Sequence, residues 1–335
     1  MLSQPRRSSQ TEQVPADAVN ESDVHFGPTE WSMSLVLALI WGSSFLWIAI
    51  AIDHVPVTVV PLARCVFGAL ALVLFPAARR RIAREDWARF AVLGLTWMAI
   101  PFLLYPIAEQ TVSTSITGMI NGALPIVTAA VTAIFTQRMP SPFRIAAVMV
   151  GAAGIALISL SSISDDAGAD AKGIVLLLIA LVCYAVAANV ARPVQAKYGA
   201  LPAMLWIEIA AIVWSLPAGL HGVATSTFSW EAFGALFMLG AIGTGLAFAL
   251  YGVLLHRAGP VRGMIGIFFT PIIGTILGVT IRNDELRPAA IVGMAVVIVG
   301  AIMTSRPEPA MSPGAARSRA TVLVTPGRAE AVGDD

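Results

Sequence analysis

Long runs of apolar residues recur through the middle of the chain, from about residue 32 to residue 304. Each run lasts 17 to 22 residues, close to the roughly 20 residues that a helix needs to cross a bilayer. Lipid offers no hydrogen bonds to free backbone groups, so we expect every run to be a helix. Ten spans are predicted: 32–52, 57–77, 89–108, 114–135, 143–162, 173–192, 202–220, 232–252, 261–281 and 288–304.

The composition also predicts an all-α integral membrane protein. Hydrophobic residues make up 57% of the 335 residues and charged residues 12%, against about 25% charged in a typical soluble domain. So few polar groups exclude an ordinary soluble enzyme, a nucleic-acid binder and a disordered chain. Cys65 and Cys183 are too few for a disulfide framework or a multi-cysteine metal site, and we expect no cofactor.

Basic residues concentrate in alternate loops, which predicts the orientation of the chain. The odd-numbered loops hold three of them: Lys172, Arg282 and Arg287. The even-numbered loops hold eleven: Arg79, Arg80, Arg81, Arg84, Arg89, Arg138, Arg144, Arg192, Lys197, Arg257 and Arg262. Basic loops stay in the cytoplasm, so we expect the even loops and, with ten spans, both termini on the cytoplasmic side of the inner membrane.

The two ends of the chain differ from its middle. Residues 1–30 and 305–335 contain no long apolar run. Neither segment can bury enough apolar surface to offset the entropy that is lost when a chain becomes ordered. We therefore expect both segments to be disordered cytoplasmic tails.

An internal repeat emerges when the sequence is shifted by 146 residues. The aligned pairs include Phe102 with Phe248, Tyr105 with Tyr251, Pro125 with Pro271, and Gly154 with Gly300. Matched Pro, Gly and Tyr residues are uncommon by chance, so we infer two halves of five helices each, residues 31–162 and 163–304. Because five is odd, the second half enters the membrane inverted, which is an architecture of secondary transporters.

Short motifs stand at defined places in the spans. They are Trp41-Gly42-Ser43-Ser44-Phe45 in the first, Pro56 followed by Arg64 in the second, and Asp284-Glu285 before Gly293 and Gly300 in the tenth. Together they resemble the EamA-type module of the drug/metabolite transporter superfamily, over about residues 33–304. The first half departs from the module, with Arg138-Met139 in place of the acidic pair. The resemblance implies transport of small metabolites, such as amino acids or nucleotide sugars, and does not fix the substrate.

Two charged residues fall inside predicted spans, where a charge is costly unless it contacts protein, water or a ligand. Arg64 is a candidate cation for a carboxylate substrate or a counter-ion, and a structural bond to helix-end carbonyls is the alternative. Glu208 is a candidate proton carrier that would suit antiport, and a neutral, hydrogen-bonded carboxyl is the alternative. The two residues could also pair across the halves.

Uncharged groups complete the candidate substrate or coupling site. Asn121 and Asn189 lie within spans, where an unpaired amide is costly, so each is expected to bond a neighbouring helix or a substrate. Four aromatic residues lie away from the expected membrane interfaces and could line an amphiphilic pocket, with ordinary packing as the alternative. They are Trp41, Tyr105, Tyr184 and Tyr251. Glu109, at the end of the third span, is expected to be solvated.

Small residues and prolines predict where helices pack closely and where they bend. Two pairs of glycines have the four-residue spacing that permits close helix approach: Gly118 with Gly122, and Gly274 with Gly278. Pro125 and Pro271 lie at matched positions and each removes a backbone hydrogen bond. They are candidates for paired hinges or for fixed bends.

These expectations converge on a secondary transporter that moves a small metabolite, an amino acid or a related amphiphile, by alternating access, with export as the expected direction. A channel or structural membrane protein is the first alternative. A membrane-embedded enzyme is less favoured, because the four histidines are scattered and no nucleophile or metal-ligand motif is present. We expect a monomer in the lipid bilayer with a small-molecule substrate, a candidate role for protons and no nucleic-acid partner.

Overall fold

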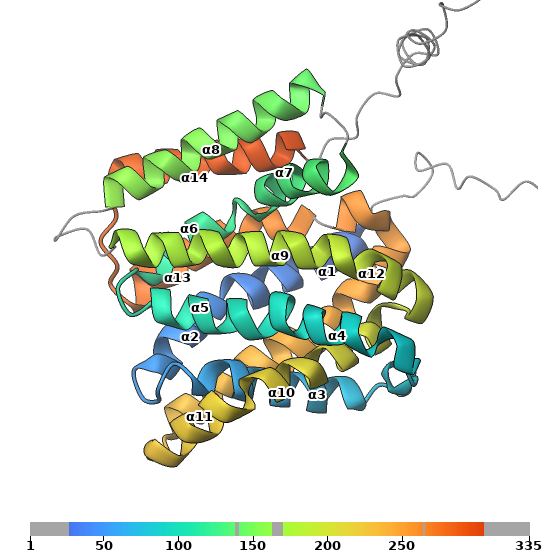
Figure 1. The fold of residues 1–335 in the computed structure, drawn as a ribbon. Helices are drawn as coiled ribbons and strands as arrows, with labels where there is room; N and C mark the ends of the chain where they lie inside the picture. The colour runs from blue at the N-terminus through green and yellow to red at the C-terminus, as the bar shows by residue number, and fades with distance from the viewer. Residues whose placement is uncertain (1–26, 138–140, 163–169, 264, 305–335) are drawn as a thin grey trace, which may run out of the picture.

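The computed structural model describes residues 27–137, 141–162, 170–263 and 265–304, so almost all of both predicted tails lies outside the described residues. All the regular elements within this range are helices. Most of them run along one common direction, parallel or antiparallel to their neighbours, as the predicted spans require (Figure 1). The first described helix, α1 (Pro28–Gly42), begins at the same end of the bundle at which the last, α14 (Pro288–Thr304), ends (Figure 1).

In the first half of the chain, several predicted spans are built from two or three consecutive helical pieces. The first span, for example, consists of α1 and the next helix, with a break at Ser43. The remaining pieces are α2 (Ser44–Ile52), α3 (Val59–Val73), η1 (Pro76–Arg79), η2 (Arg84–Asp86), α4 (Trp87–Leu93), η3 (Gly94–Ala99), α5 (Ile100–Ala108), α6 (Thr114–Asn121), α7 (Leu124–Thr136) and α8 (Pro142–Ser162).

The second half begins with two long helices and continues with shorter pieces. In chain order they are α9 (Ala171–Tyr198), α10 (Ala200–Thr225), α11 (Trp230–Phe237), η4 (Met238–Leu246), α12 (Ala247–Gly263), η5 (Ile265–Phe269), α13 (Thr270–Ile281) and α14. The helices α8 and α14 are close partners and lie together at one side of the bundle (Figure 1).

Six helical stretches in the described residues are long and apolar enough to cross a membrane, which supports a membrane protein. They are Pro28–Ile52, Arg84–Ala108, Thr114–Thr136, Ala171–Tyr198, Ala200–Thr225 and Trp230–Leu254. Four further apolar helices have 10–17 residues: Val59–Val73, Ile145–Ser161, Gly266–Ile281 and Pro288–Met303. Each predicted span therefore falls on an apolar helix, while the count of ten crossing helices stays a prediction.

Large apolar side chains cover much of the outer surface. Leu74, Ile134 and Leu160 are more than 70% exposed, and Trp87 and Trp230 are also exposed. A water-soluble monomer rarely exposes apolar area on this scale. The surface instead matches the lipid-facing side of a membrane protein, where such residues contact acyl chains.

The two halves contain π-helical segments at matched places. In the first half the segment is η3, and in the second half it is η4. A shift of 146 residues aligns Gly94, the first residue of η3, with Gly240 of η4. Single π-helical turns are rare and occur frequently at functional sites. Their recurrence at equivalent positions agrees with the internal repeat seen in the sequence.

The helices α6 and α13 cross at the predicted glycine pairs. A Cβ atom on Gly118 would lie 3.4 Å from the Cα atom of Gly274, and one on Gly122 would lie 2.5 Å from Cγ of Pro271. A Cβ atom on Gly278 would overlap the Ser115 hydroxyl. A larger side chain at Gly122 or Gly278 would therefore force its neighbours to shift, whereas a Cβ atom on Gly118 would make an ordinary van der Waals contact.

Both predicted bends coincide with interruptions of a helix. The helix α6 ends at Asn121, and Pro125 lies in the first turn of α7. In the second half, the 3₁₀ segment η5 ends at Phe269, and Pro271 lies in the first turn of α13. Proline fits the first turn of a helix because its missing N–H has no partner there. Each proline therefore begins a new helical piece, and a hinge role remains a prediction.

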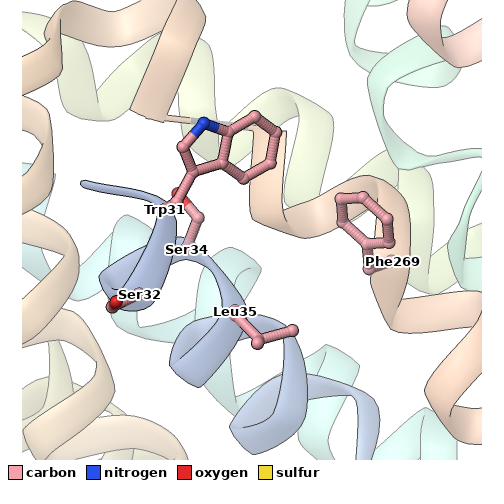
Figure 2. Close-up of a pocket in the computed structure, with 5 residues that line it drawn as sticks. All are labelled: Trp31, Ser32, Ser34, Leu35 and Phe269. Carbon is pink, nitrogen blue, oxygen red and sulfur yellow. The ribbon is translucent and has the colours of Figure 1, made fainter. Parts of the chain in front are cut away.

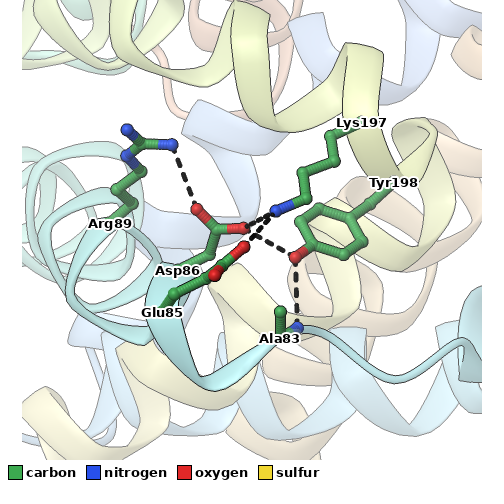
Figure 3. A network of polar contacts seen from close by, with 6 residues as sticks. All are labelled: Ala83, Glu85, Asp86, Arg89, Lys197 and Tyr198. Carbon is green, nitrogen blue, oxygen red and sulfur yellow. Dashed lines mark hydrogen bonds and ion pairs between the residues drawn. The ribbon is translucent and has the colours of Figure 1, made fainter.

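A polar network joins the halves at the end of the bundle where α4 begins (Figure 3). Asp86 is almost fully buried and accepts hydrogen bonds from Lys197 Nζ at 2.7 Å and from the Tyr198 hydroxyl at 2.6 Å. Arg89 contacts the other carboxylate oxygen at 3.0 Å. The Tyr198 hydroxyl also accepts from the backbone N–H of Ala83 at 3.1 Å. The buried carboxylate is thus compensated by two cations and a hydroxyl.

Other polar contacts join the halves at the opposite end of the bundle. Arg282, after α13, forms an ion pair of 2.6 Å with Asp53, after α2. Asp284 accepts a hydrogen bond of 2.7 Å from the backbone N–H of Ser115 in the first turn of α6. A carboxylate at this position is favoured by the helix dipole. Contacts between the halves therefore exist at both ends.

Candidate functional site

Arg64 lies on α3 and is only 9% exposed. Its Nε donates a hydrogen bond of 3.0 Å to the Thr244 hydroxyl of η4. Its Cζ lies 3.8 Å from the centre of the Phe102 ring on α5, a cation–π contact. Among the described residues, the two terminal nitrogens of Arg64 donate to no protein acceptor. A buried cation with an unused edge is suited to bind an anion.

Aromatic rings from both halves also pack on one another in two groups. Phe45 and Tyr184 flank Tyr105, at ring-centre distances of 5.9 and 6.1 Å. Trp41 contacts Phe248 at 5.9 Å and Tyr251 at 5.5 Å. The pair Phe102 and Tyr105 aligns with Phe248 and Tyr251 in the internal repeat, so each half contributes one such pair. We call these rings the central aromatic cluster: Trp41, Phe45, Phe102, Tyr105, Tyr184, Phe248 and Tyr251.

Hydrogen bonds fix part of this cluster. The Tyr105 hydroxyl donates to Oδ1 of Asn121 at 2.6 Å, which joins α5 to α6. The indole N–H of Trp41 donates to the backbone carbonyl of Gly243 in η4 at 3.1 Å. Tyr184 and Tyr105 also lie within electrostatic reach of Arg64. The structure thus brings together four predicted site residues, Arg64, Tyr105, Asn121 and Tyr184. It packs two others, Trp41 and Tyr251, on each other.

Asn189 makes a different set of contacts. Its side chain accepts a hydrogen bond of 3.1 Å from the Thr132 hydroxyl and donates one of 2.8 Å to the carbonyl of Ala185. The first bond joins α9 to α7, and the second stays within α9. Among the two predicted roles for this residue, the geometry favours the helix-to-helix bond.

Glu208 lies on α10 and is completely buried. Its carboxyl packs against Gly68 of α3, where a Cβ atom would lie 2.5 Å from the Oε2 atom. Gly68 is one helical turn from Arg64, so the Glu208 carboxyl packs on the face of α3 that carries Arg64. Arg64 and Glu208, both in described parts of the chain, form no direct ion pair, and neither carboxyl oxygen of Glu208 has a hydrogen-bond partner there.

Glu109 differs from the expectation of a solvated residue. Both of its carboxyl oxygens are buried and have no hydrogen-bond partner among the described residues. Burial raises the pKa of Glu109 well above its ordinary value, and the nearby carboxylate of Asp284 raises this pKa further. Arg282 and Arg64 act in the opposite direction. The sequence did not indicate this burial because the acid follows the last turn of α5.

The described part of the chain contains surface pockets, among them the following two. One, of about 220 Å³, is lined by Trp31, Ser32, Ser34, Leu35 and Phe269, at the start of α1 (Figure 2). The other, of about 140 Å³, lies where Pro61, Leu103 and Trp214 meet. Neither of these two pockets is lined by Arg64 or by the central aromatic cluster.

Sequence reasoning missed two residues that hold Arg64. Thr244 stands between two glycines in an apolar run, and nothing in its local sequence marks its contact with α3. Phe102 gave a weak signal, because it aligns with Phe248 in the repeat. Its contact with the guanidinium depends on how α5 packs beside α3, which the sequence pattern does not specify.

Comparison with known proteins places these features in context. The sequence profile of the EamA-like transporter family matches residues 30–160 and again residues 171–306. A solved crystal structure superposes with a TM-score of 0.54 at 16% identity, over 83% of this chain and 96% of that one. At this identity the likeness concerns the fold alone.

Two curated relatives align over most of the chain. A probable terminal-alkyne amino-acid exporter from Streptantibioticus cattleyicolor is 24% identical over 284 residues, which cover 82% of this chain and 93% of the relative. The uncharacterized inner membrane transporter YedA of Escherichia coli strain K12 is 22% identical over 277 residues, which cover 80% of this chain and 88% of that protein. Both names describe transporters rather than enzymes.

Proposed function

Because the chain belongs to the EamA-like transporter family, we propose that it is a secondary transporter that exports a small amphiphilic metabolite of the amino-acid type. The observation that carries this proposal is Arg64, a buried cation whose terminal nitrogens bind no described protein acceptor. A charge inside a membrane bundle is costly. A carboxylate substrate would supply the missing acceptors, with charge-assisted hydrogen bonds stronger than neutral ones.

The central aromatic cluster supports an apolar side chain on the substrate. Rings provide a large contact area, and Tyr184 and Tyr251 each add a polar hydroxyl at the end of the ring. The relative from Streptantibioticus cattleyicolor is named as an exporter of terminal-alkyne amino acids, which combine a carboxylate with a short apolar side chain. This combination matches a cation placed among aromatic rings.

Alternating access is the transport mode that we propose. The two profile matches and the paired π-helical segments support two related halves, and five helices in each half would make them inverted. The halves contact each other at both ends, for example through Asp86 with Lys197 and through Asp53 with Arg282. In this mode, the contacts at one end would break while those at the other end hold. We propose a monomer with ten spans and both termini in the cytoplasm.

Proton coupling through Glu208 completes the proposal. This carboxyl lies within electrostatic reach of Arg64 and has no hydrogen-bond partner in the described residues. The substrate's ammonium group would favour the ionised carboxylate and so release its proton. A proton that enters while the substrate leaves would drive export, as in an antiporter.

The test is transport by purified protein in liposomes. Counterflow of radiolabelled L-leucine and L-propargylglycine, an amino acid with a terminal alkyne, is measured for the wild type, Arg64→Gln and Arg64→Lys. We expect Arg64→Gln to lower kcat/KM at least about tenfold, because a hydrogen bond to a charged group contributes about 1.5–3 kcal/mol. Lysine retains the charge without the planar fork, so only partial recovery is expected.

Arg81→Gln serves as the matched control, since Arg81 is exposed at the end of the bundle. It is expected to transport like the wild type. Wild-type counterflow by a well-folded Arg64→Gln protein would refute the carboxylate site. Flux that neither saturates nor shows counterflow would favour a channel instead.

A further inference from the structure

The guanidinium of Arg64 is held in two independent ways. Thr244 accepts the hydrogen bond from Nε at 3.0 Å, which fixes one edge of the group. The Phe102 ring lies 3.8 Å from Cζ and covers one face. An arginine plane is defined once an edge and a face are both fixed. The remaining edge, between the two terminal nitrogens, donates to no acceptor among the described residues.

The π-helical segment η4 explains why Thr244 accepts from Arg64. The Thr244 hydroxyl donates its proton to the carbonyl of Leu239, five residues earlier, at 2.9 Å. A hydroxyl has one proton and two lone pairs, so with its proton used it presents a lone pair to Nε. Thr244 is fully buried, and water therefore does not compete for this position.

We propose that Thr244 and Phe102 are positioning residues, which aim the two terminal nitrogens of Arg64 at a substrate carboxylate. This inference rests on the proposed function and adds a binding geometry and a selectivity to it. Arginine can grip a carboxylate through Nε and one terminal nitrogen, or through both terminal nitrogens. Since Nε is already bonded to Thr244, the carboxylate binds end-on, with one oxygen to each terminal nitrogen.

The geometry also predicts which molecules are rejected. An amide or ester presents one good acceptor oxygen instead of two equivalent ones, and an amide points N–H donors at the cation. An arginine held in one orientation cannot turn to improve such a contact. The site therefore prefers the carboxylate of an amino acid over the matching amide, and this preference depends on Thr244.

The experiment compares Thr244→Val, which has nearly the same shape without the hydroxyl, with Thr244→Ser, which keeps it. Counterflow of L-leucine in liposomes gives KM and maximal rate, and competition by L-leucinamide gives the carboxylate preference. Thr244→Val is expected to raise KM about tenfold, because a hydrogen bond to a charged group is lost. The maximal rate is expected to stay within about twofold of wild type. The preference for L-leucine over L-leucinamide is expected to become smaller. Thr244→Ser is expected to behave like the wild type.

Thr117→Val is the matched control. Thr117 is also fully buried, but its hydroxyl has no hydrogen-bond partner among the described residues. It is expected to leave KM and the preference unchanged. Phe102→Leu removes the ring that stacks on the guanidinium. It is expected to raise KM and to reduce the carboxylate preference as well, so it tests the inference if Thr244→Val fails to fold.

The outcomes separate the two proposals. If Arg64→Gln impairs transport while Thr244→Val and Phe102→Leu keep the wild-type KM and amide rejection, the positioning roles are wrong and the carboxylate site stands. If Arg64→Gln also transports like the wild type, the carboxylate site itself is wrong. A loss of rate in Thr244→Val without a change in KM or preference would indicate a purely structural threonine and would overturn the inference.

Discussion

Glu208 is the residue whose chemistry depends most on its surroundings. Its carboxyl is buried between α10 and α3 without a hydrogen-bond partner in the described residues. Glycine at position 68 leaves the space that this carboxyl fills. A buried polar group without a partner is costly, so its presence here favours a functional role over packing.

Replacement of Glu208 by Gln separates substrate exchange from the coupling of transport to protons. Glutamine has the same shape but cannot release a proton, so Glu208→Gln is expected to keep substrate counterflow and to lose the acceleration of export by an inward proton gradient. Liposomes with and without an imposed pH difference measure both activities. Glu285→Gln, at an exposed acid, is the control and should respond like the wild type. A gradient response retained by Glu208→Gln would rule out this acid as the proton carrier.

Single residues were predictable where their chemistry conflicts with their surroundings. Arg64 and Glu208 are charged residues within apolar runs, and this conflict can be seen in the sequence itself. The partners of Arg64 were not predictable, because Thr244 is 180 residues away in the chain and its contact depends on helix packing. Glu109 was assigned to solvent, since the sequence does not show that neighbouring segments cover the end of α5.

The crossing of α6 and α13 depends on small residues at the element scale. A Cβ atom on Gly122 would lie 2.5 Å from Cγ of Pro271, whereas one on Gly234 of α11 would meet no atom within 4 Å. These two glycines therefore form a matched pair for substitution.

Gly122→Ala is expected to destabilise the folded protein by about 1–3 kcal/mol, the usual cost of overpacking a filled interior. Gly234→Ala is expected to leave stability unchanged or slightly higher, because alanine has the better helix propensity. Thermal unfolding in detergent measures both proteins. Equal melting temperatures for the two variants would mean that the crossing is not tightly packed.

Elements were predictable from periodicity and length, and their internal breaks were less so. Ten apolar runs fall on helices because lipid-exposed helices must be apolar along their length. Prolines marked the interruptions before α7 and α13. The π-helical segments η3 and η4 had no such mark, since a π turn arises from packing and backbone hydrogen bonding rather than from one residue type.

The orientation of the whole molecule in the membrane can be tested with single cysteines. In a chain with Cys65→Ala and Cys183→Ala, two exposed positions are changed to cysteine: His54, just after α2, and Glu85, in η2 just before α4. The end of α2 and the start of α4 lie at opposite ends of the bundle (Figure 1). The excess of basic residues near Glu85 predicts that this end is cytoplasmic. A membrane-impermeant maleimide applied to intact cells is therefore expected to label His54→Cys and to leave Glu85→Cys unlabelled.

Permeabilised cells provide the control, in which both variants should react. Labelling of Glu85→Cys alone in intact cells would reverse the orientation. Labelling of both would contradict a membrane between the two ends. The sequence could predict this orientation from loop charge, yet it could not predict which charges form buried networks such as that of Asp86.

The paired π-helical segments also determine how this protein tolerates changes in length. Each residue added to or removed from a helix turns everything beyond it by about 100° around the axis. Loss of one residue within 238–246 would restore regular winding and swing Phe248 and Tyr251 away from Trp41. A deletion or insertion in this stretch would therefore remove the aromatic contacts that the second half makes with Trp41.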